Sequence, residues 1–158
     1  MPHEHERQRG AQAPSQPPRV LIVDDEAALR LVCRVNLRFA GFETLEAADG
    51  RSALSLARSE EPDLILLDVM IPGPDGWEVA EALRSSPETR SIPIVFLSAL
   101  ASKSDERRGY EVGGVAFIKK PFDPGALAPT IDQVLERVRA GEEEQLRAEW
   151  LARLTTSG

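Results

Sequence analysis

The chain has 158 residues with 42% hydrophobic and 28% charged side chains, which is typical of a folded, water-soluble protein with room for one ordinary domain. Its 26 acidic residues outnumber 19 Lys and Arg, and the resulting charge of −7 makes nucleic acid a poor partner. No stretch is long and apolar enough to predict a membrane span or a secretory signal. Cys33 is the single cysteine, so we expect a cytoplasmic protein without an internal disulfide.

Residues 1–18 form the first segment and contain mainly His, Gln, Arg, Pro and Ala. Burial of so few apolar side chains cannot offset the loss of chain entropy, so we predict a disordered tail. The composition changes at Arg19, where Val20-Leu21-Ile22-Val23 predicts a buried strand. This strand runs directly into the acidic sequence Asp24-Asp25-Glu26.

The pattern of strand and helix then repeats along the chain. Apolar runs indicate further strands over residues 42–47, 63–68, 92–98 and 115–118. Apolar residues at spacings of three and four predict helices over residues 26–40, 49–59, 77–85, 102–112 and 123–140. Loops rich in Gly and Pro, above all Pro72-Gly73-Pro74-Asp75-Gly76, separate several of them.

Five strands with a helix between each pair predict a parallel sheet, because parallel neighbours need a crossover connection. Crossover helices on both faces of the sheet bury both sides of each strand. This explains why the strands are continuous apolar runs rather than runs in which apolar and polar residues alternate. We therefore predict a doubly wound α/β domain over residues 19–140.

Polar residues follow several of the predicted strands, and in such a sheet the carboxyl ends of the strands lie at one edge. Asp24 and Asp25 come at the end of the first strand, Asp68 closes the third, Ser98 closes the fourth, and Lys120 follows the fifth. Clustered carboxylates repel one another unless a cation neutralises them, and oxygen ligands favour Mg²⁺. Asp24 or Asp25 considered alone is equally well explained as the cap of the next helix.

Four motifs in this order resemble the receiver domains of two-component response regulators, which are typified by the chemotaxis response regulator. They are Leu21-Ile22-Val23-Asp24-Asp25-Glu26, Asp63 to Gly76, Phe96-Leu97-Ser98-Ala99, and Gly113-Gly114 with Phe117-Ile118-Lys119-Lys120-Pro121-Phe122. The resemblance covers residues 19 to about 140. It implies a flavodoxin-like fold with five strands and five helices.

The resemblance also implies a role for each residue at the acidic edge. Asp68 would accept a phosphoryl group from a sensor histidine kinase or a histidine phosphotransfer protein. Asp24, Asp25, Asp68 and the backbone carbonyl of Met70 would hold Mg²⁺. Lys120 would supply an ammonium that stabilises the phosphoryl oxygens, whereas its neighbour Lys119 is expected to be a solvated surface charge.

Two further residues resemble the switch of the family. Ser98 matches the hydroxyl that moves to the new phosphoryl group, and Phe117 replaces the more common Tyr as the aromatic that swings inward behind it. An ordinary core position for Phe117 remains an alternative. The resemblance also implies a cis Lys120–Pro121 bond, and Gly113-Gly114 departs from the usual Gly-Ala pair, which is expected only to loosen the turn.

Residues 141–158 predict a short additional helix with an apolar stripe. The stripe consists of Leu146, Trp150, Leu151 and Leu154. The segment of residues 141–158 is too short and too acidic to be a DNA-binding output domain, so we expect a receiver domain that stands alone. The stripe would mediate a homodimer or a partner contact if it is exposed. Alternatively, it folds back onto the core of its own chain.

We therefore expect a single-domain response regulator of a two-component phosphorelay. Phosphorylation would change a surface that a downstream protein target recognises. Alternatives are a phosphate shuttle between two histidines and, less favoured, an aspartyl-phosphate phosphohydrolase, which would usually carry a second Asp where this chain has Met70. We expect no turnover of an external substrate and hence no enzyme in the usual sense.

Overall fold

A computed structural model of the protein describes residues 16–99 and 102–156, with side chains described up to Ala152. The predicted disordered tail, residues 1–18, therefore lies outside the described residues except for Gln16, Pro17 and Pro18, which form neither helix nor strand. Among the described residues, no helix combines the length and apolar character that crossing a membrane requires.

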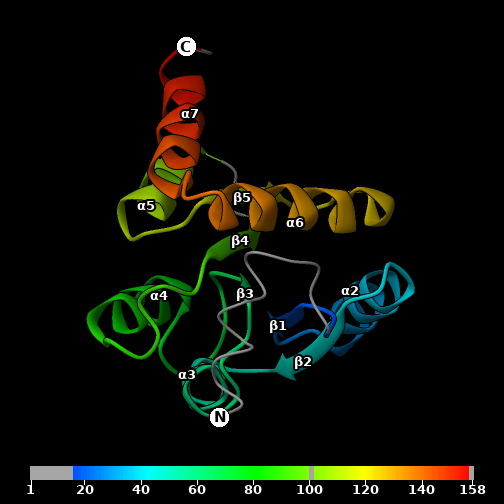
Figure 1. Cartoon of the computed structure of the whole chain (residues 1–158). Coiled ribbons are helices and arrows are strands. Elements are labelled where there is room, and N and C mark those ends of the chain that lie inside the picture. Colours follow the sequence, from blue (N-terminus) through cyan, green and yellow to red (C-terminus); the bar gives the residue numbers. More distant parts are fainter. Residues whose placement is uncertain (1–15, 100–101, 157–158) are drawn as a thin grey trace, which may run out of the picture.

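Five parallel strands form one sheet in the order β2-β1-β3-β4-β5 (Figure 1). Their bounds are β1 Arg19–Val23, β2 Glu43–Ala47, β3 Leu64–Leu67, β4 Ile94–Ser98 and β5 Ala116–Lys119. The chain adds β2 on one side of β1 and the later strands on the other, so the strand order reverses between β1 and β3. Ligand sites of such sheets lie at this reversal, outside the carboxyl ends of the strands. The predicted doubly wound α/β fold is confirmed.

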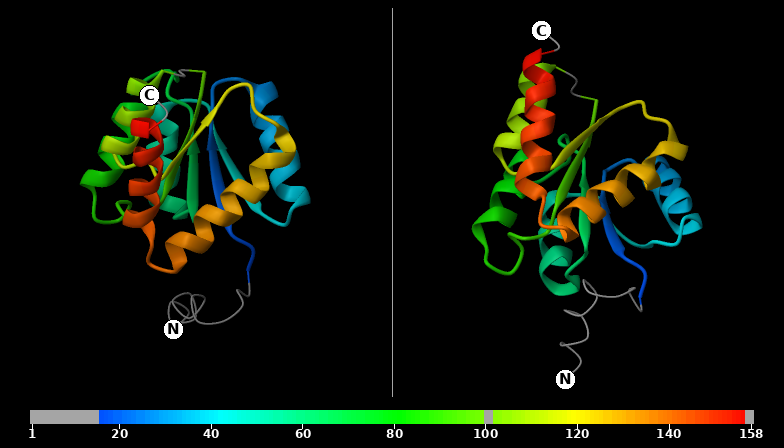
Figure 2. Two further views of the ribbon diagram at one scale, coloured as in Figure 1. Left: turned by 90° about the horizontal axis from the view of Figure 1, so that it is seen from above. Right: turned by 45° about the horizontal axis from the view of Figure 1, so that its top comes forward.

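Six helices are described, and five of them cover the two faces of the sheet (Figures 1 and 2). Their bounds are α2 Ala27–Phe39, α3 Gly50–Glu60, α4 Gly76–Ser85, α5 Lys103–Glu111, α6 Pro124–Arg139 and α7 Glu143–Thr156. Alternate strand residues enter two separate cores. Leu21 and Val23 pack with α3, α4 and α5 on one face, whereas Val20 and Ile22 pack with α2 and α6 on the other. The continuous apolar runs of the strands thus arise from burial on both sides.

The element boundaries differ from the predictions by one or two residues, for local reasons. The first helix begins at Ala27 with Glu26 at its N-cap, so neither Asp24 nor Asp25 takes the cap position that we had left open. The fourth strand begins at Ile94 rather than Ile92. Pro93 lies just before it, where its missing N–H leaves no gap in the ladder and its carbonyl accepts from the Ile65 N–H.

The C-terminal helix α7 folds back onto its own chain. It contacts α5, β5 and α6, and lies beside α5 in Figures 1 and 2. Leu146 is buried, and Trp150 and Leu151 pack against the core. The fold-back alternative is therefore confirmed for these residues, because they cover the β5 edge, and a homodimer through the last helices stays a prediction. The side chain of Leu154 lies outside the described residues.

Candidate functional site

Three carboxylates gather at the carboxyl edge of the sheet, as the sequence predicted. Asp24 and Asp25 follow β1, and Asp68 follows β3; one oxygen atom of each lies within 4.8 Å of the others. The parallel pairing of β1 with β3 brings them together, because Val23 lies opposite Leu67 in the register. Asp24 is 1% exposed and Asp68 4%, whereas Asp25 faces solvent.

Lys120 connects the two buried carboxylates. Its Nζ donates to Oδ2 of Asp24 at 2.8 Å and to Oδ2 of Asp68 at 3.3 Å. The lysine comes from the far side of the sheet, directly after β5, where its backbone N–H donates to the Ser98 carbonyl. The Lys120–Pro121 bond is cis, as the resemblance implied. The structure thus brings the ends of β1, β3, β4 and β5 into one site.

The protonation of these groups is shifted by their mutual contact. Burial and the nearby charge of Asp24 raise the pKa of the Asp68 carboxyl, and Lys120 offsets part of this rise. Burial by itself lowers the pKa of Lys120. Its hydrogen bonds to Asp24 and Asp68 and the charges of both outweigh that effect, so the pKa of the lysine is raised. Lys120 is therefore held as a cation between the two carboxylates.

The chemistry of this donor set fits a divalent cation. Three carboxylates face the site, and among the described residues the cation in salt-bridge contact with Asp24 and Asp68 is Lys120. One ammonium leaves an excess of negative charge in a place that is largely shielded from water, and a bound cation would relieve it. Hard oxygen ligands at two buried positions and one exposed position suit an ion that keeps part of its hydration shell.

The position of Asp24 depends on neighbours that sequence reasoning missed. Its Oδ1 accepts from the Glu26 N–H, and its carbonyl accepts from Nη1 of Arg30. Arg30 in turn contacts Glu46 on β2. Burial raises the pKa of Glu46, but hydrogen bonds from Arg34 and Arg30 outweigh burial and lower it. The spacing of Arg30 and Arg34 indicates that both lie on one face of a helix. Their shared partner, Glu46 on β2, is known only once the fold brings the two elements together.

The loop after Asp68 is held tightly against the start of α4. The Gly76 N–H donates to the Val69 carbonyl, and a Cβ at Gly76 would lie 2.5 Å from the carbonyl oxygen of Asp68. Only glycine allows this approach. Asp75 and Glu78 form a capping box that begins α4 at this point. Within the loop, the Met70 N–H donates to Oδ1 of Asp68, so the residue predicted to offer its carbonyl also orients the carboxylate.

The two predicted switch residues lie on the neighbouring strands β4 and β5. Ser98 ends β4 and is fully buried. Phe117 on β5 lies opposite Phe96 in the register, its side chain is buried, and the two ring centroids are 6.1 Å apart. Phe117 therefore occupies an inward position.

One expectation near the switch is confirmed and one needs correction. Lys119 is exposed, as expected, and its Nζ also pairs with Oε2 of the buried Glu106 at 2.9 Å, which ties β5 to α5. Gly114 does more than loosen its turn. A Cβ at this position would lie 2.8 Å from the Phe96 ring and 2.9 Å from the Gly109 carbonyl oxygen. The second glycine is therefore required by the bulk of Phe96.

A mostly apolar groove adjoins Lys120. We call it the Lys120 groove. It lies between α2 and the β5–α6 connection and is lined by Glu26, Leu29, Val32, Ala99, Lys120, Pro121, Phe122 and Pro124. An apolar surface next to a charged site favours contact with another protein surface.

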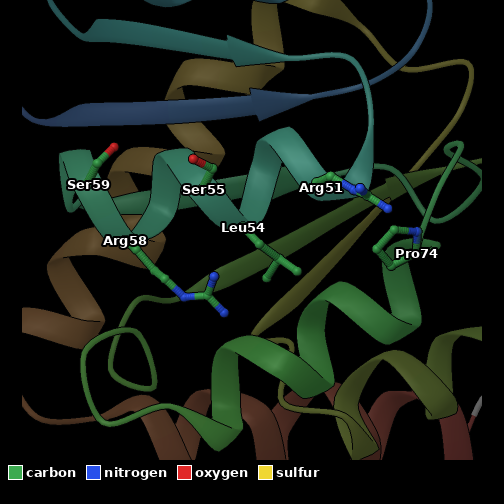
Figure 3. A pocket seen from close by; sticks show the side chains of 6 residues that line it. All are labelled: Arg51, Leu54, Ser55, Arg58, Ser59 and Pro74. Carbon is green, nitrogen blue, oxygen red and sulfur yellow. The ribbon is translucent and has the colours of Figure 1, made fainter.

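A second groove lies between α3 and α4. Figure 3 shows Leu54 and Arg58 reaching from α3 toward α4, with Arg51 beside Pro74 at the other end. Ser55 and Ser59 complete its lining. None of these residues belongs to the acidic cluster, so this groove is separate from the site.

Comparisons with known proteins agree with this geometry. A family model described as the response regulator receiver domain matches residues 20–132. The phosphate regulon transcriptional regulatory protein PhoB of Pseudomonas aeruginosa is 42% identical over 125 residues, which cover 79% of this chain and 55% of PhoB. The DNA-binding dual master transcriptional regulator RpaA of a Synechocystis strain is 38% identical over 123 residues, covering 78% of this chain and 48% of RpaA. The chain thus spans about half the length of these curated relatives.

Solved structures show the same fold. The chemotaxis response regulator CheY4 of Vibrio cholerae superposes with a TM-score of 0.71 at 34% identity, covering 75% of this chain and 98% of CheY4. The receiver domain of the Francisella response regulator 1452 gives a TM-score of 0.72 at 29% identity, covering 77% and 98% of the two chains. The likeness covers about three quarters of this chain in both cases.

Proposed function

The chain belongs to the family of response regulator receiver domains, and from this premise we propose that Asp68 accepts a phosphoryl group from a phosphohistidine of a partner protein. The observation that carries the proposal is the position of Lys120, whose ammonium lies between the buried carboxylates of Asp24 and Asp68. Ion pairs that serve only the fold need no third carboxylate, yet Asp25 joins the pair from the solvent side.

In the proposed reaction an oxygen of the Asp68 carboxylate forms a bond to phosphorus as the P–N bond of the phosphohistidine breaks. The bonding electron pair remains on the imidazole nitrogen, and the product is an aspartyl phosphate. Phosphoryl transfer spreads negative charge over the equatorial oxygens, so catalysis consists mainly of positioning and charge neutralisation. Lys120 would move its donated hydrogen bond from the carboxylate to a phosphoryl oxygen. The Met70 N–H keeps the other Asp68 oxygen oriented.

We infer that Asp24, Asp25, Asp68 and the carbonyl of Met70 hold Mg²⁺. The ion would neutralise the charge of the phosphoryl oxygens and of the two neighbouring carboxylates. Asp25 is the exposed member of the set, so it can take up a hydrated ion directly from solvent. Asp24 is fixed by Arg30 and by the Glu26 N–H, which holds its side chain ready for binding.

The proposed output is a change of surface rather than a reaction product. Ser98 would donate its hydroxyl to a phosphoryl oxygen, and Phe117 would fill the space behind it. A downstream protein would recognise the altered face, and the Lys120 groove offers the donor protein an apolar contact beside the acceptor. The donor would be a sensor histidine kinase or a histidine phosphotransfer protein. The proposal includes a cytoplasmic location, where such donors act.

Intact mass after incubation with acetyl phosphate tests the proposal. We expect one phosphoryl addition that requires Mg²⁺ and is absent from Asp68→Asn. Labelling of Asp68→Asn to the same extent as the natural chain would contradict it. A parallel assay with a phosphomonoester checks that the chain does not turn over an external substrate, and sustained release of phosphate would favour a hydrolase instead.

A further inference from the structure

The helix α5 has an unusually small apolar contact with the rest of the molecule. Its sequence, KSDERRGYE, is mainly charged, and the residues it buries are Glu106, Gly109 and Tyr110. Tyr110 is therefore its one large buried ring, and it is 1% exposed. A nine-residue helix with so little apolar burial gains its stability from its neighbours rather than from its own sequence.

The neighbour that covers Tyr110 is α7. The ring of Trp150 stacks on Tyr110 with centroids 6.4 Å apart and an angle of 22° between the planes. Nη2 of Arg147 donates to the Tyr110 carbonyl near the end of α5. The helix α7 thus holds both the side chain and the backbone of the main anchor of α5.

The position of α7 is fixed independently of α5. Leu146 packs into the core on the α6 side, and Arg137 of α6 pairs with Glu142 and with Glu149 at 2.9 Å. Both pairs are partly exposed, so they orient α7 more than they stabilise it. The helix α7 therefore contacts both α6, which buries five apolar residues, and α5, which buries one large apolar side chain.

Below Tyr110, α5 closes over the proposed switch ring. A Cβ at Gly109 would lie 3.2 Å from both the Phe117 ring and the Phe96 ring, so the backbone of α5 rests on the two rings. The pair between Glu106 and Lys119 ties the same helix to β5 beside Lys120. The inward ring of Phe117 therefore packs against a helix that also contacts α7.

We propose that α7 is a positioning element of the switch: by holding α5 over Phe117 it favours the inward position of that ring, and so it favours phosphorylation of Asp68. The link to Asp68 rests on the proposed function. Coupling between two equilibria is reciprocal, so a phosphoryl group on Asp68 tightens the docking of α7 in return. Trp150 and Arg147 are the positioning residues, since neither contacts the carboxylates directly.

The first arm of the test needs no phosphoryl group. Amide hydrogen exchange is compared between the full natural chain and Trp150→Ala, with Arg147→Gln as a milder variant. We expect exchange in α5 and β5 to become at least about fivefold faster, with no change in α2 and α3. Gln145→Ala changes an exposed residue of α7 and should leave α5 unaffected. Unchanged exchange in α5 in both variants would overturn the proposal.

The second arm measures the affinity for beryllofluoride, a phosphoryl mimic, in the presence of Mg²⁺. We expect affinity to fall about fivefold or more in both variants, while the affinity for Mg²⁺ alone stays the same. In the natural chain, the mimic should slow exchange in α7. A purely structural role would alter exchange in α5 and leave the affinity for the mimic unchanged, which would overturn the coupling. No binding of the mimic to the natural chain would instead overturn the proposed function, and the coupling with it.

Discussion

The two sides of the sheet edge differ in how they are anchored. The acidic side rests on β1 and β3, whose residues are buried on both faces, and Asp24 is held by the Glu26 N–H, Arg30 and Lys120. The α5 side rests on one buried ring, on its contact with α7 and on two side-chain pairs, Glu106 with Lys119 and Arg108 with Trp77. Rigid placement suits the carboxylates, because they must hold a fixed geometry around a phosphoryl group. The smaller apolar contact of α5 suits a region that must move when the switch changes state.

Removing Lys120 tests the rigid side and should have the largest effect. Lys120→Ala leaves the buried carboxylates of Asp24 and Asp68 without their shared cation, which costs about 3 kcal/mol of unfolding free energy. Urea denaturation in the presence of a chelator measures the loss. Lys103→Ala, at an exposed position on α5, is the control and should change stability by less than about 0.5 kcal/mol. Equal effects of the two variants would show that the lysine does not hold the acidic side together.

Gly114→Ala tests the packing beneath α5. A methyl group would collide with the Phe96 ring and the Gly109 carbonyl, so we expect a loss of about 1–3 kcal/mol in thermal unfolding. Gly125→Ala is the matched control, because its Cβ would meet only Asp123 Oδ1 at 3.5 Å. The control should be neutral or slightly stabilising. If Gly114→Ala is as stable as the control, the α5 side is looser than the structure implies.

Mg²⁺ should stabilise the acidic side of the sheet edge. Binding to the folded state stabilises it, and at an ion concentration 10 times the dissociation constant the gain is about 1.4 kcal/mol. Thermal unfolding with Mg²⁺ and with a chelator measures it. Asp25→Asn should remove most of the gain while hardly changing the stability without metal, because Asp25 faces solvent. An undiminished gain in this variant would place the ion elsewhere.

The smallest expected effect concerns the reactivity of the Cys33 thiol, which depends on how tightly the core beneath α2 is closed. Burial, together with the charge of Asp24, raises the pKa of its thiol to about 12. Since the thiolate is the reactive form, we expect no alkylation by iodoacetamide at pH 8 in the folded state and rapid alkylation in urea. Rapid alkylation of the folded chain would mean that the core under α2 opens readily.

The sequence was sufficient for features that depend on order along the chain. Parallel strands separated by helices require that Asp24, Asp68 and Lys120 end at one edge, so the fold and the acidic cluster could be predicted. The pairing of Lys119 with Glu106 and the need for glycine at Gly114 depend on neighbours across space. The stripe on α7 showed an apolar face, but not that Tyr110 would supply its partner.

The most direct test of phosphoryl transfer to Asp68 is to locate the modified residue after phosphorylation. The chain is treated with acetyl phosphate and Mg²⁺, reduced with borohydride, which converts an aspartyl phosphate to homoserine, and digested for peptide mass analysis. We expect conversion at Asp68 alone, with Asp24 and Asp25 unchanged. Conversion at Asp24 or Asp25, or full phosphorylation with Asp68 intact, would contradict it.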